Sequence, residues 1–225
     1  MRRHLTLLVA FIALATVSQA QNFQSAAAAA SAAKEVTESK VVNFSQPTAP
    51  SQFPNVKIEN FGQMDERLYR GAQPLPDDYQ SLKDLGITTV IDLRKDNTDY
   101  EKAKVEELGM KYVHIPMTGW TTRDESVEDF MKVMNDPANG KVYVHCAAGK
   151  HRTGLVGAIY RLEKYGWDYE TAYKEMKNYE YFSGLFHRKI KGYVKDYFKK
   201  HGPAKQEAFR ASAAAKQLAA AGQAN

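Results

Sequence analysis

Short β-rich apolar runs alternate with helical stretches through the middle of the chain, and this alternation constrains the fold more than any other feature. The predicted strands cover residues 67–70, 88–93, 111–115 and 141–145. The predicted helices cover residues 77–85, 98–108, 126–134, 153–165, 169–179 and 187–199. Strands that alternate with helices form a parallel or mixed sheet that is covered by helices. We therefore predict an α/β fold with a central parallel or mixed sheet, whose ligands bind at the carboxyl ends of the strands.

The composition is that of one folded domain with tails. Hydrophobic residues make up 44% of the 225 residues and aromatic residues 11%, which is enough for a core and excludes wholesale disorder. The net charge of +5 is too small to indicate a nucleic-acid partner, and none is expected. A single cysteine excludes an intramolecular disulfide and a multi-cysteine metal site. No His-x-x-x-His motif or paired carboxylate cluster indicates a metal, so we expect neither metal nor cofactor.

Both ends of the chain differ in composition from its middle. Residues 1–20 are typical of a secretory signal peptide, with Arg2 and Arg3 before an apolar stretch and a small-x-small cleavage site that ends at Ala20. The apolar stretch is short for a membrane span, although an uncleaved anchor is the alternative. We expect a secreted or periplasmic protein with no stable membrane association after cleavage. The other predicted segments are a low-complexity linker (21–54), one domain (55–202) and an Ala-rich tail (203–225).

The candidate chemistry follows the last predicted strand directly. That strand continues into Cys146-Ala147-Ala148-Gly149-Lys150-His151-Arg152-Thr153-Gly154, and a helix begins there. Backbone N–H groups of such a loop, together with the helix N-terminus, bind a tetrahedral anion and favour a thiolate. Arg152 can donate two hydrogen bonds to phosphate oxygens, and Gly149 lets the loop curl without filling it. The pattern predicts a nucleophilic Cys146, the alternative being a buried structural thiol.

The string His145-Cys146-x5-Arg152-Thr153 carries the H-C-x5-R-[ST] signature. Through this signature the chain resembles the cysteine-dependent phosphatases of the protein-tyrosine and dual-specificity superfamily. It is most similar to the plant and fungal atypical dual-specificity group and related bacterial, phytase-like proteins. The resemblance extends over about residues 60–200 and includes Leu68-Tyr69-Arg70-Gly71 and the strand from Val90 to Arg94. It implies a protein-tyrosine-phosphatase-like fold and a phosphomonoester hydrolase.

The chemistry and the resemblance together assign roles to the loop residues. We expect Cys146 to attack phosphorus and form a thiophosphoryl-enzyme, which water then hydrolyses. Arg152 and the backbone amides of the loop would bind the phosphoryl oxygens. These loop residues are Ala147, Ala148, Gly149, Lys150 and His151. The resemblance gives Thr153 a hydroxyl contact to the sulfur and His145 the task of orienting the loop.

The leaving group needs a general acid on a neighbouring loop. Asp124 is the aspartate of the segment 117–125, which follows the strand 111–115, and we expect it to be the acid. Members of the resembled family often carry Trp-Pro-Asp here, whereas this chain has Trp120-Thr121-Thr122-Arg123-Asp124, and the family usually places the acid farther from the cysteine. Asp124 can equally belong to the N-terminus of the following helix. The other possibilities are Glu125, Glu128, Asp129 or no protein acid.

Basic residues around the loop bear on the substrate. Lys150, His151 and Arg152 would put up to three cations together, and Arg94, Lys95 and Arg188 are candidates for the rim. Such a rim suits a substrate with several phosphates, and the resembled group includes enzymes that act on inositol phosphates. We therefore expect an inositol polyphosphate, the alternative being a phosphotyrosine or dual-specificity phosphoprotein substrate. Lys150 and His151 can also be plain loop surface. A rhodanese-type sulfurtransferase and a phospho-ligand-binding pseudo-phosphatase are remote alternatives.

Overall fold

The structure is a computed structural model that describes residues 46–50, 53–96, 98–118, 123–184 and 187–222. The predicted signal peptide and most of the predicted linker therefore lie outside the described residues. By their contacts the described residues belong to one compact unit. Within them, no helix combines the length and the apolar character needed to cross a membrane.

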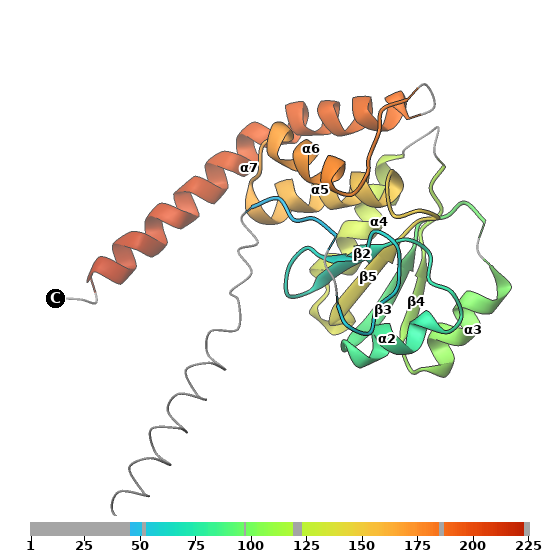
Figure 1. Ribbon diagram of the computed structural model, residues 1–225. Coiled ribbons are helices and arrows are strands. Elements are labelled where there is room, and N and C mark those ends of the chain that lie inside the picture. The colour runs from blue at the N-terminus through green and yellow to red at the C-terminus, as the bar shows by residue number, and fades with distance from the viewer. Residues whose placement is uncertain (1–45, 51–52, 97, 119–122, 185–186, 223–225) are drawn as a thin grey trace, which may run out of the picture. The chain divides into compact units, whose positions relative to one another are not determined.

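Five strands form one sheet in the order β1-β2-β5-β3-β4 (Figure 1). Their bounds are β1 Gly62–Gln63, β2 Leu68–Gly71, β3 Ile87–Asp92, β4 Lys111–His114 and β5 Lys141–His145. β1 pairs antiparallel with β2, and all other pairs are parallel. His145 pairs in register with Gly71 on one side and Asp92 on the other. The chain therefore leaves β5 at the middle of the carboxyl edge, where ligands of such sheets bind.

Helices cover both faces of the sheet. Their bounds are α2 Asp78–Asp84, α3 Asp99–Glu107, α4 Asp124–Asn135, a 3-10 turn Pro137–Asn139, α5 Arg152–Tyr165, α6 Tyr169–Asn178 and α7 Arg188–Gly222. α2 and α3 pack on one face, α4 and α5 on the other, and α6 and α7 pack against α5 (Figure 1). The sheet thus separates two apolar clusters, one on each face.

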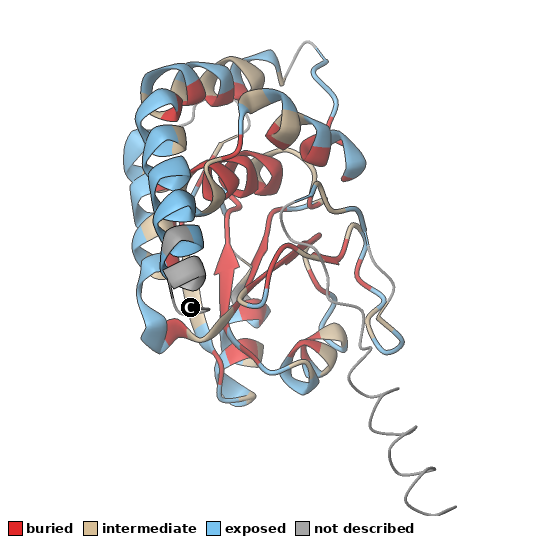
Figure 2. Ribbon diagram, turned by 90° about the vertical axis from the view of Figure 1, so that its left-hand side faces the viewer, coloured by how far each residue is buried: buried red, intermediate tan, exposed pale blue. Residues whose placement is uncertain are grey.

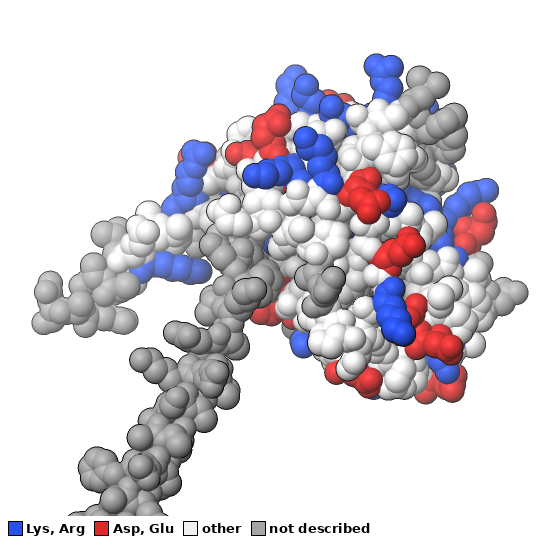
Figure 3. Space-filling model, viewed as in Figure 1, with Lys and Arg blue, Asp and Glu red and all other residues white. Residues whose placement is uncertain are grey.

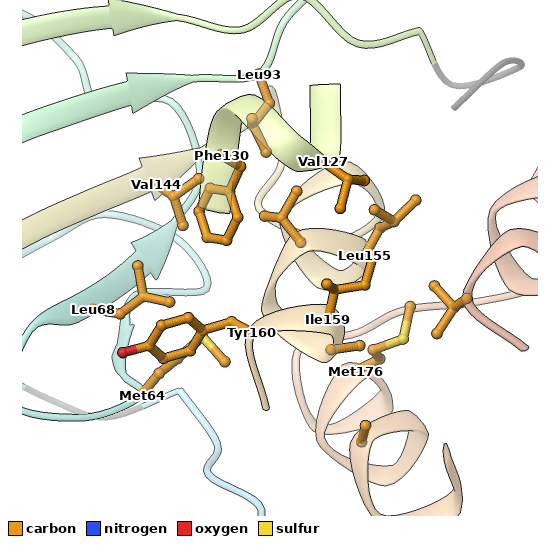
Figure 4. Close-up of a cluster of buried hydrophobic side chains, with 14 of the residues drawn as sticks. Met64, Leu68, Leu93, Val127, Phe130, Val144, Leu155, Ile159, Tyr160 and Met176 are labelled. Atoms are coloured by element: carbon orange, nitrogen blue, oxygen red, sulfur yellow. The ribbon is translucent and has the colours of Figure 1, made fainter. Parts of the chain in front are cut away.

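α5 is the central helix of the domain, and most of it is buried (Figure 2). Its Tyr160 lies beside Met64 and Leu68 on the sheet side, whereas its Leu155 and Ile159 lie on the other side, toward Met176 of α6 (Figure 4). Full burial of a side chain of this size contributes about 1.5–3 kcal/mol. Apolar residues nearly all round the helix explain why it lies inside rather than on the surface. The packing fixes the start of α5, where Arg152 stands.

The alternating pattern of the sequence agrees with the structure, since each predicted strand and helix is present and, the end of the last helix excepted, lies within a few residues of its expected bounds. The two-residue strand β1 was not expected, because it is too short to show a period. α7 continues to Gly222, far beyond residue 199. Pro203 removes one backbone hydrogen bond, but the alanines that follow have the highest helix propensity.

Residues 46–50, which the sequence places in the linker, are attached to α6. The Thr48 backbone N–H and hydroxyl both donate to Glu175 Oε1 at 2.9 Å, and Asn178 Nδ2 donates to the Thr48 carbonyl at 2.9 Å. This part of the predicted linker therefore packs on the domain. On the face shown in Figure 3, acidic and basic side chains are interspersed, so the small net charge is distributed there rather than gathered.

Candidate active site

The loop from Cys146 to His151 joins the end of β5 to the start of α5. Gly149 lies at its turn with a φ of +69°, the left-handed region that favours glycine. A Cβ at this position would lie 2.4 Å from the carbonyl carbon of Gly71, at the end of β2. The loop and β2 therefore approach so closely that only glycine fits.

The loop carbonyls point away from the loop centre. Three successive carbonyls accept hydrogen bonds from outside the loop: Ala147 O from Gln73 N (3.1 Å), Ala148 O from Asn60 Nδ2 (3.1 Å) and Gly149 O from Arg70 Nη2 (2.6 Å). A trans peptide places its N–H opposite its C=O, so the following N–H groups face the other side. Converging N–H groups of this kind bind anions. The three donors thus hold the loop as a cradle whose N–H groups face inward, and anion binding by it stays a prediction.

The Cys146 thiol is buried in this cradle. Burial alone would raise the pKa of the Cys146 thiol. The positive charge of Arg152, hydrogen bonds from the Thr153 hydroxyl and amide, and one from the Gly149 amide outweigh burial and lower that pKa. The buried Thr153 hydroxyl has no other hydrogen-bond partner among the described residues. The geometry thus favours a thiolate with Thr153 beside it.

Arg152 is held by two backbone carbonyls beyond the ends of neighbouring strands. Its Nη1 donates to Leu93 O and to Met117 O, each at 3.2 Å. Among the described residues no other hydrogen bond is made by its guanidinium, so Nε and Nη2 are available to an anion. An arginine with two such donors can bind a phosphate in a bidentate manner.

His145 connects the loop to a buried charge network. Its Nδ1 lies 3.3 Å from the Cys146 carbonyl oxygen, and its Nε2 lies 2.7 Å from Glu101 Oε1 of α3. Arg94 Nη2 lies 2.6 Å from both Asp92 Oδ2 and Glu101 Oε2. His145, Asp92 and Glu101 are all fully buried. This network holds the first residue of the loop from within the domain, and the orienting role of His145 stays a prediction.

The same network corrects the expectation for Arg94. The sequence predicts Arg94 on the substrate rim, but it is only 8% exposed, and its guanidinium forms ion pairs with Asp92 and Glu101. Asp92, Glu101 and His145 bring ligand atoms within 4.8 Å of one another, as metal ligands do. The Arg94 guanidinium already provides the positive charge that these two carboxylates need.

The basic loop residues are less cationic than the sequence suggests. Lys150 Nζ forms an ion pair with Glu180 Oε2 at 2.6 Å. The His151 ring stacks on His187 with 3.4 Å between ring centroids, and its Nε2 lies 3.2 Å from Phe182 O. Burial and the neighbouring His187 lower the pKa of His151 to about 4, so the ring is neutral at pH 7. Of the three expected cations, one is neutral and one is paired.

The remaining rim and acid candidates lie on the surface. Lys95 follows β3 and Arg188 begins α7, and both are exposed. Asp124, the first residue of α4, is also exposed, and its Oδ1 accepts a hydrogen bond from the Tyr193 hydroxyl of α7 at 2.6 Å. No hydrogen bond or ion pair among the described residues joins Asp124 to the loop.

Asp124 instead lines a groove of about 410 Å³ between α4 and α7. Glu128 lines the same groove, Glu125 is exposed beside it, and Asp129 pairs with Lys132 at 2.9 Å. Residues 119–122, which precede this helix, lie outside the described residues. The position of the general acid therefore stays a prediction.

Sequence reasoning missed the residues that support the loop from outside. Asn60, Gln73 and Glu101 act on the loop or on His145 from 40 or more residues earlier in the chain, and no local pattern marks them. Arg70 was noted only as part of the Leu68–Gly71 string. Asn60 has a φ of +52°, a conformation that asparagine tolerates better than most residues. For these supporting residues the sequence therefore offers only weak signals, the Leu68–Gly71 string for Arg70 and the asparagine at position 60.

Comparison with known proteins agrees with this geometry. Residues 55–206 match the model of a family described as the tyrosine phosphatase family. The dual specificity protein phosphatase TpbA of Pseudomonas aeruginosa (strain UCBPP-PA14) is 30% identical over 119 residues, which are 52% of this chain and 53% of that protein. The inositol diphosphatase DSP3 of Arabidopsis thaliana is 30% identical over 113 residues, 47% of this chain and 56% of that protein.

The solved structures include similar folds. The crystal structure of P. aeruginosa TpbA superposes with a TM-score of 0.58 at 25% identity and covers 73% of this chain and 97% of that chain. The catalytic core of Siw14 from S. cerevisiae in complex with citrate has the same fold, with a TM-score of 0.53 at 21% identity, over 67% of this chain and 96% of that chain. The chain spans about half the length of the curated relatives it matches.

Proposed function

Because this chain belongs to the tyrosine phosphatase family, we propose that it is a phosphomonoester hydrolase that uses Cys146 as its nucleophile. The observation that carries this proposal is the cradle itself. Its three carbonyls are held outward, and the pKa of its buried thiol is lowered. A thiolate at the centre of converging amides and a guanidinium has the geometry that an in-line attack on phosphorus needs.

In the first step the Cys146 thiolate attacks phosphorus, the P–S bond forms and the ester P–O bond breaks. The leaving alcohol or phenol takes a proton from the general acid, for which Asp124 stays our candidate. Arg152 and the loop amides stabilise the charge on the equatorial oxygens. In the second step water attacks phosphorus and returns a proton to the acid, and the sulfur leaves as a thiolate beside the Thr153 hydroxyl. The sum is ester plus water to alcohol plus inorganic phosphate.

For the substrate we favour an inositol polyphosphate. The relatives named inositol diphosphatases support this choice, as does Lys150, whose ion pair with the 63% exposed Glu180 side chain can exchange for a phosphate. The relatives named dual specificity protein phosphatase favour a phosphoprotein as the second candidate. Because His151 is neutral and Arg94 is buried, the rim is less basic than the sequence predicts.

The test measures phosphate release from phytate and from a phosphotyrosyl peptide side by side, under reducing conditions, with Cys146→Ser as the blank. We expect both to be hydrolysed and phytate to be preferred. A peptide preference would select the second candidate. Turnover by Cys146→Ser equal to that of the wild type would end the cysteine mechanism, and rapid sulfur transfer from thiosulfate without phosphate release would favour a sulfurtransferase.

We also propose that the chain is exported by residues 1–20 and cleaved after Ala20. Support comes from the sequence alone, in the paired arginines, the short apolar stretch and the small residues before position 21. Expression in a bacterial host, fractionation and N-terminal sequencing test this. A mature N-terminus at Gln21 in the periplasm or medium is the expected result, and an intact chain retained in the cytoplasm would contradict it.

A further inference from the structure

Arg70 is a buried arginine at the edge of the cradle. It is the third residue of β2, pairs in register with Val144 of β5 and is 1% exposed. Its Nη2 donates to Gly149 O at 2.6 Å, and the guanidinium lies over the Tyr179 ring at 3.9 Å. Gly157 of α5 lies beside it, since a Cβ there would be in ordinary van der Waals contact with Arg70 Nη1 at 3.6 Å. Several elements therefore enclose this side chain.

The charge of Arg70 lacks a dedicated carboxylate. The other buried arginines of the described residues each bond one or more carboxylates, Arg94 to Asp92 and Glu101 and Arg161 to Glu175. No ion pair of the described residues includes Arg70, and its Nε has no hydrogen-bond partner there. A buried charge is costly unless an opposite charge is close.

The groups that act on Arg70 include the nucleophile. Burial lowers the pKa of Arg70, whereas Tyr179, Glu175, Cys146 and Tyr143 act in the opposite direction. Glu175 already bonds Arg161 through both of its oxygens. The tyrosine hydroxyls are neutral at pH 7, since burial raises the pKa of Tyr143 and that of Tyr179 further. A deprotonated Cys146 is therefore the remaining anion among these groups, and Arg70 would share it with Arg152.

We propose that Arg70 is a positioning residue of the reaction: it holds the Gly149 carbonyl outward, and its buried guanidinium takes the Cys146 thiolate as its counter-ion. The inference rests on the proposed function, because it assigns support to that nucleophile. Arg152 acts on the thiol from α5, Arg70 acts from β2, and Tyr143 of β5 is neutral. The His145 ring on the same strand contacts Glu101 through its Nε2.

The test measures the charge state of Cys146 without any substrate. Cys146 is the single cysteine of the chain, so the pH dependence of alkylation by iodoacetamide reports its thiolate alone. Arg70→Met removes the charge and the donor, and we expect the midpoint of the alkylation profile to rise by about one pH unit. Arg70→Lys keeps the charge, so its midpoint should stay close to that of the wild type.

Asn60→Ala is the matched control, because it removes the donor to the adjacent Ala148 carbonyl but no charge. Its midpoint should move much less than that of Arg70→Met. If Arg70→Met does not fold, judged by circular dichroism and thermal melting, Arg70→Gln replaces it with an uncharged donor. A folded Arg70→Met or Arg70→Gln with the wild-type midpoint would overturn the proposal, as would an Arg70→Lys midpoint raised as far as theirs.

This measurement separates the inference from the proposed function. A wild-type protein that released no phosphate from any ester would contradict the function, yet its alkylation profile would still report on Arg70. With an active wild type, Arg70→Met should lower kcat on the acidic limb of its pH profile, because a smaller fraction of Cys146 is ionised there. Raising the pH should restore part of that loss in Arg70→Met, and the loss would not depend on pH if Arg70 merely filled space.

Discussion

Glu101 Oε1 of α3 lies 2.7 Å from His145 Nε2, and both side chains are completely buried. Through His145 this contact reaches the Cys146 carbonyl, and through Arg94 it reaches the end of β3. α3, which contributes no residue to the loop, thereby fixes the point at which the loop begins.

Glu101→Gln should therefore cost both stability and activity. The change removes one charge from a buried network and leaves Arg94 with one carboxylate, so we expect a loss of about 3 kcal/mol in the free energy of unfolding. Urea denaturation checks this. The control is Glu106→Gln on the same helix, where an exposed pair with Lys102 at 3.9 Å contributes little. Equal stability of the two variants would contradict the network.

Gly149→Ala should remove most of the activity. A Cβ at Gly149 would lie 2.4 Å from the Gly71 carbonyl carbon, and φ is +69° there, so the loop must shift. A displacement of about 1 Å in a catalytic loop costs on the order of 100-fold in rate. Steady-state kinetics with an aryl phosphate measure it. Gly192→Ala, on a helix with nothing within 4 Å of the added Cβ, should keep full activity and gain slightly in stability.

The stacked pair of His151 and His187 should make stability depend on pH. Burial, then the charge of His187, lowers the pKa of His151 to about 4, below its value of 6.5 in an unfolded chain. Between these values the unfolded chain binds more protons, so stability falls as the pH falls from about 6.5 to about 4. Because His151 is partly exposed, the loss should be about 1–2 kcal/mol.

An NMR titration of His151 gives its midpoint directly, with about 4 as the expected value. Urea denaturation at pH 7 and pH 4.5 should show a smaller difference for His151→Gln than for the wild type. His201→Gln, on α7, is the control and should keep the wild-type difference. A His151 midpoint near 6.5 would show that the stack does not exclude a proton.

Tyr193 should influence the acid step if Asp124 is the general acid. Its hydroxyl donates to Asp124 Oδ1 at 2.6 Å, so Tyr193→Phe releases that carboxylate. We expect a stability loss of about 1 kcal/mol and a changed kcat on an alkyl phosphate. Tyr197→Phe is the matched control, because its hydroxyl donates to Glu163 at 3.1 Å instead.

Asp124→Asn completes this test. A poor leaving group needs protonation more than a good one, so hydrolysis of an alkyl phosphate should slow more than that of an aryl phosphate. Unchanged alkyl hydrolysis would remove Asp124 from the mechanism. The effect of Tyr193→Phe on kcat would then also have to vanish.

Glu180 should limit the affinity for a polyphosphate. Its carboxylate holds Lys150 Nζ at 2.6 Å, and Glu180→Gln would leave the ammonium to a ligand. An exposed ion pair is worth little, so KM for phytate should fall only about threefold, and less at high salt. Lys150→Ala should raise the same KM. A KM that is unaffected by both changes would make Lys150 plain surface.

The sequence predicts the secondary structure around Cys146 well. The strand, loop and helix around Cys146 are contiguous, so period, glycine and arginine identify them together. A parallel or mixed sheet follows from the alternation of strands and helices, but the order in which the strands pair does not. Arg94 illustrates the limit of such predictions. A basic residue just after a strand suggests the substrate rim, but Arg94 is bound by Glu101, seven residues later.

The same limit applies to the donors of the cradle. Asn60, Arg70 and Gln73 are ordinary polar residues in their own surroundings, and only the fold brings them to the loop carbonyls. The charge of the loop was also overestimated from the sequence. The neutrality of His151 depends on burial and on His187, which lies 36 positions later in the chain, after α5 and α6.

The outward-held carbonyls also have a consequence for how the chain acquires its chemistry. Their donors Arg70 and Asn60 stand 79 and 88 residues before the acceptors. Contacts so distant in sequence close large loops and form slowly. A chain in which β2 had not yet docked would hold every residue of the signature but would lack the donors to Ala148 O and Gly149 O. The rate at which Cys146 takes on its native reactivity during refolding should therefore report when β2 docks against the loop.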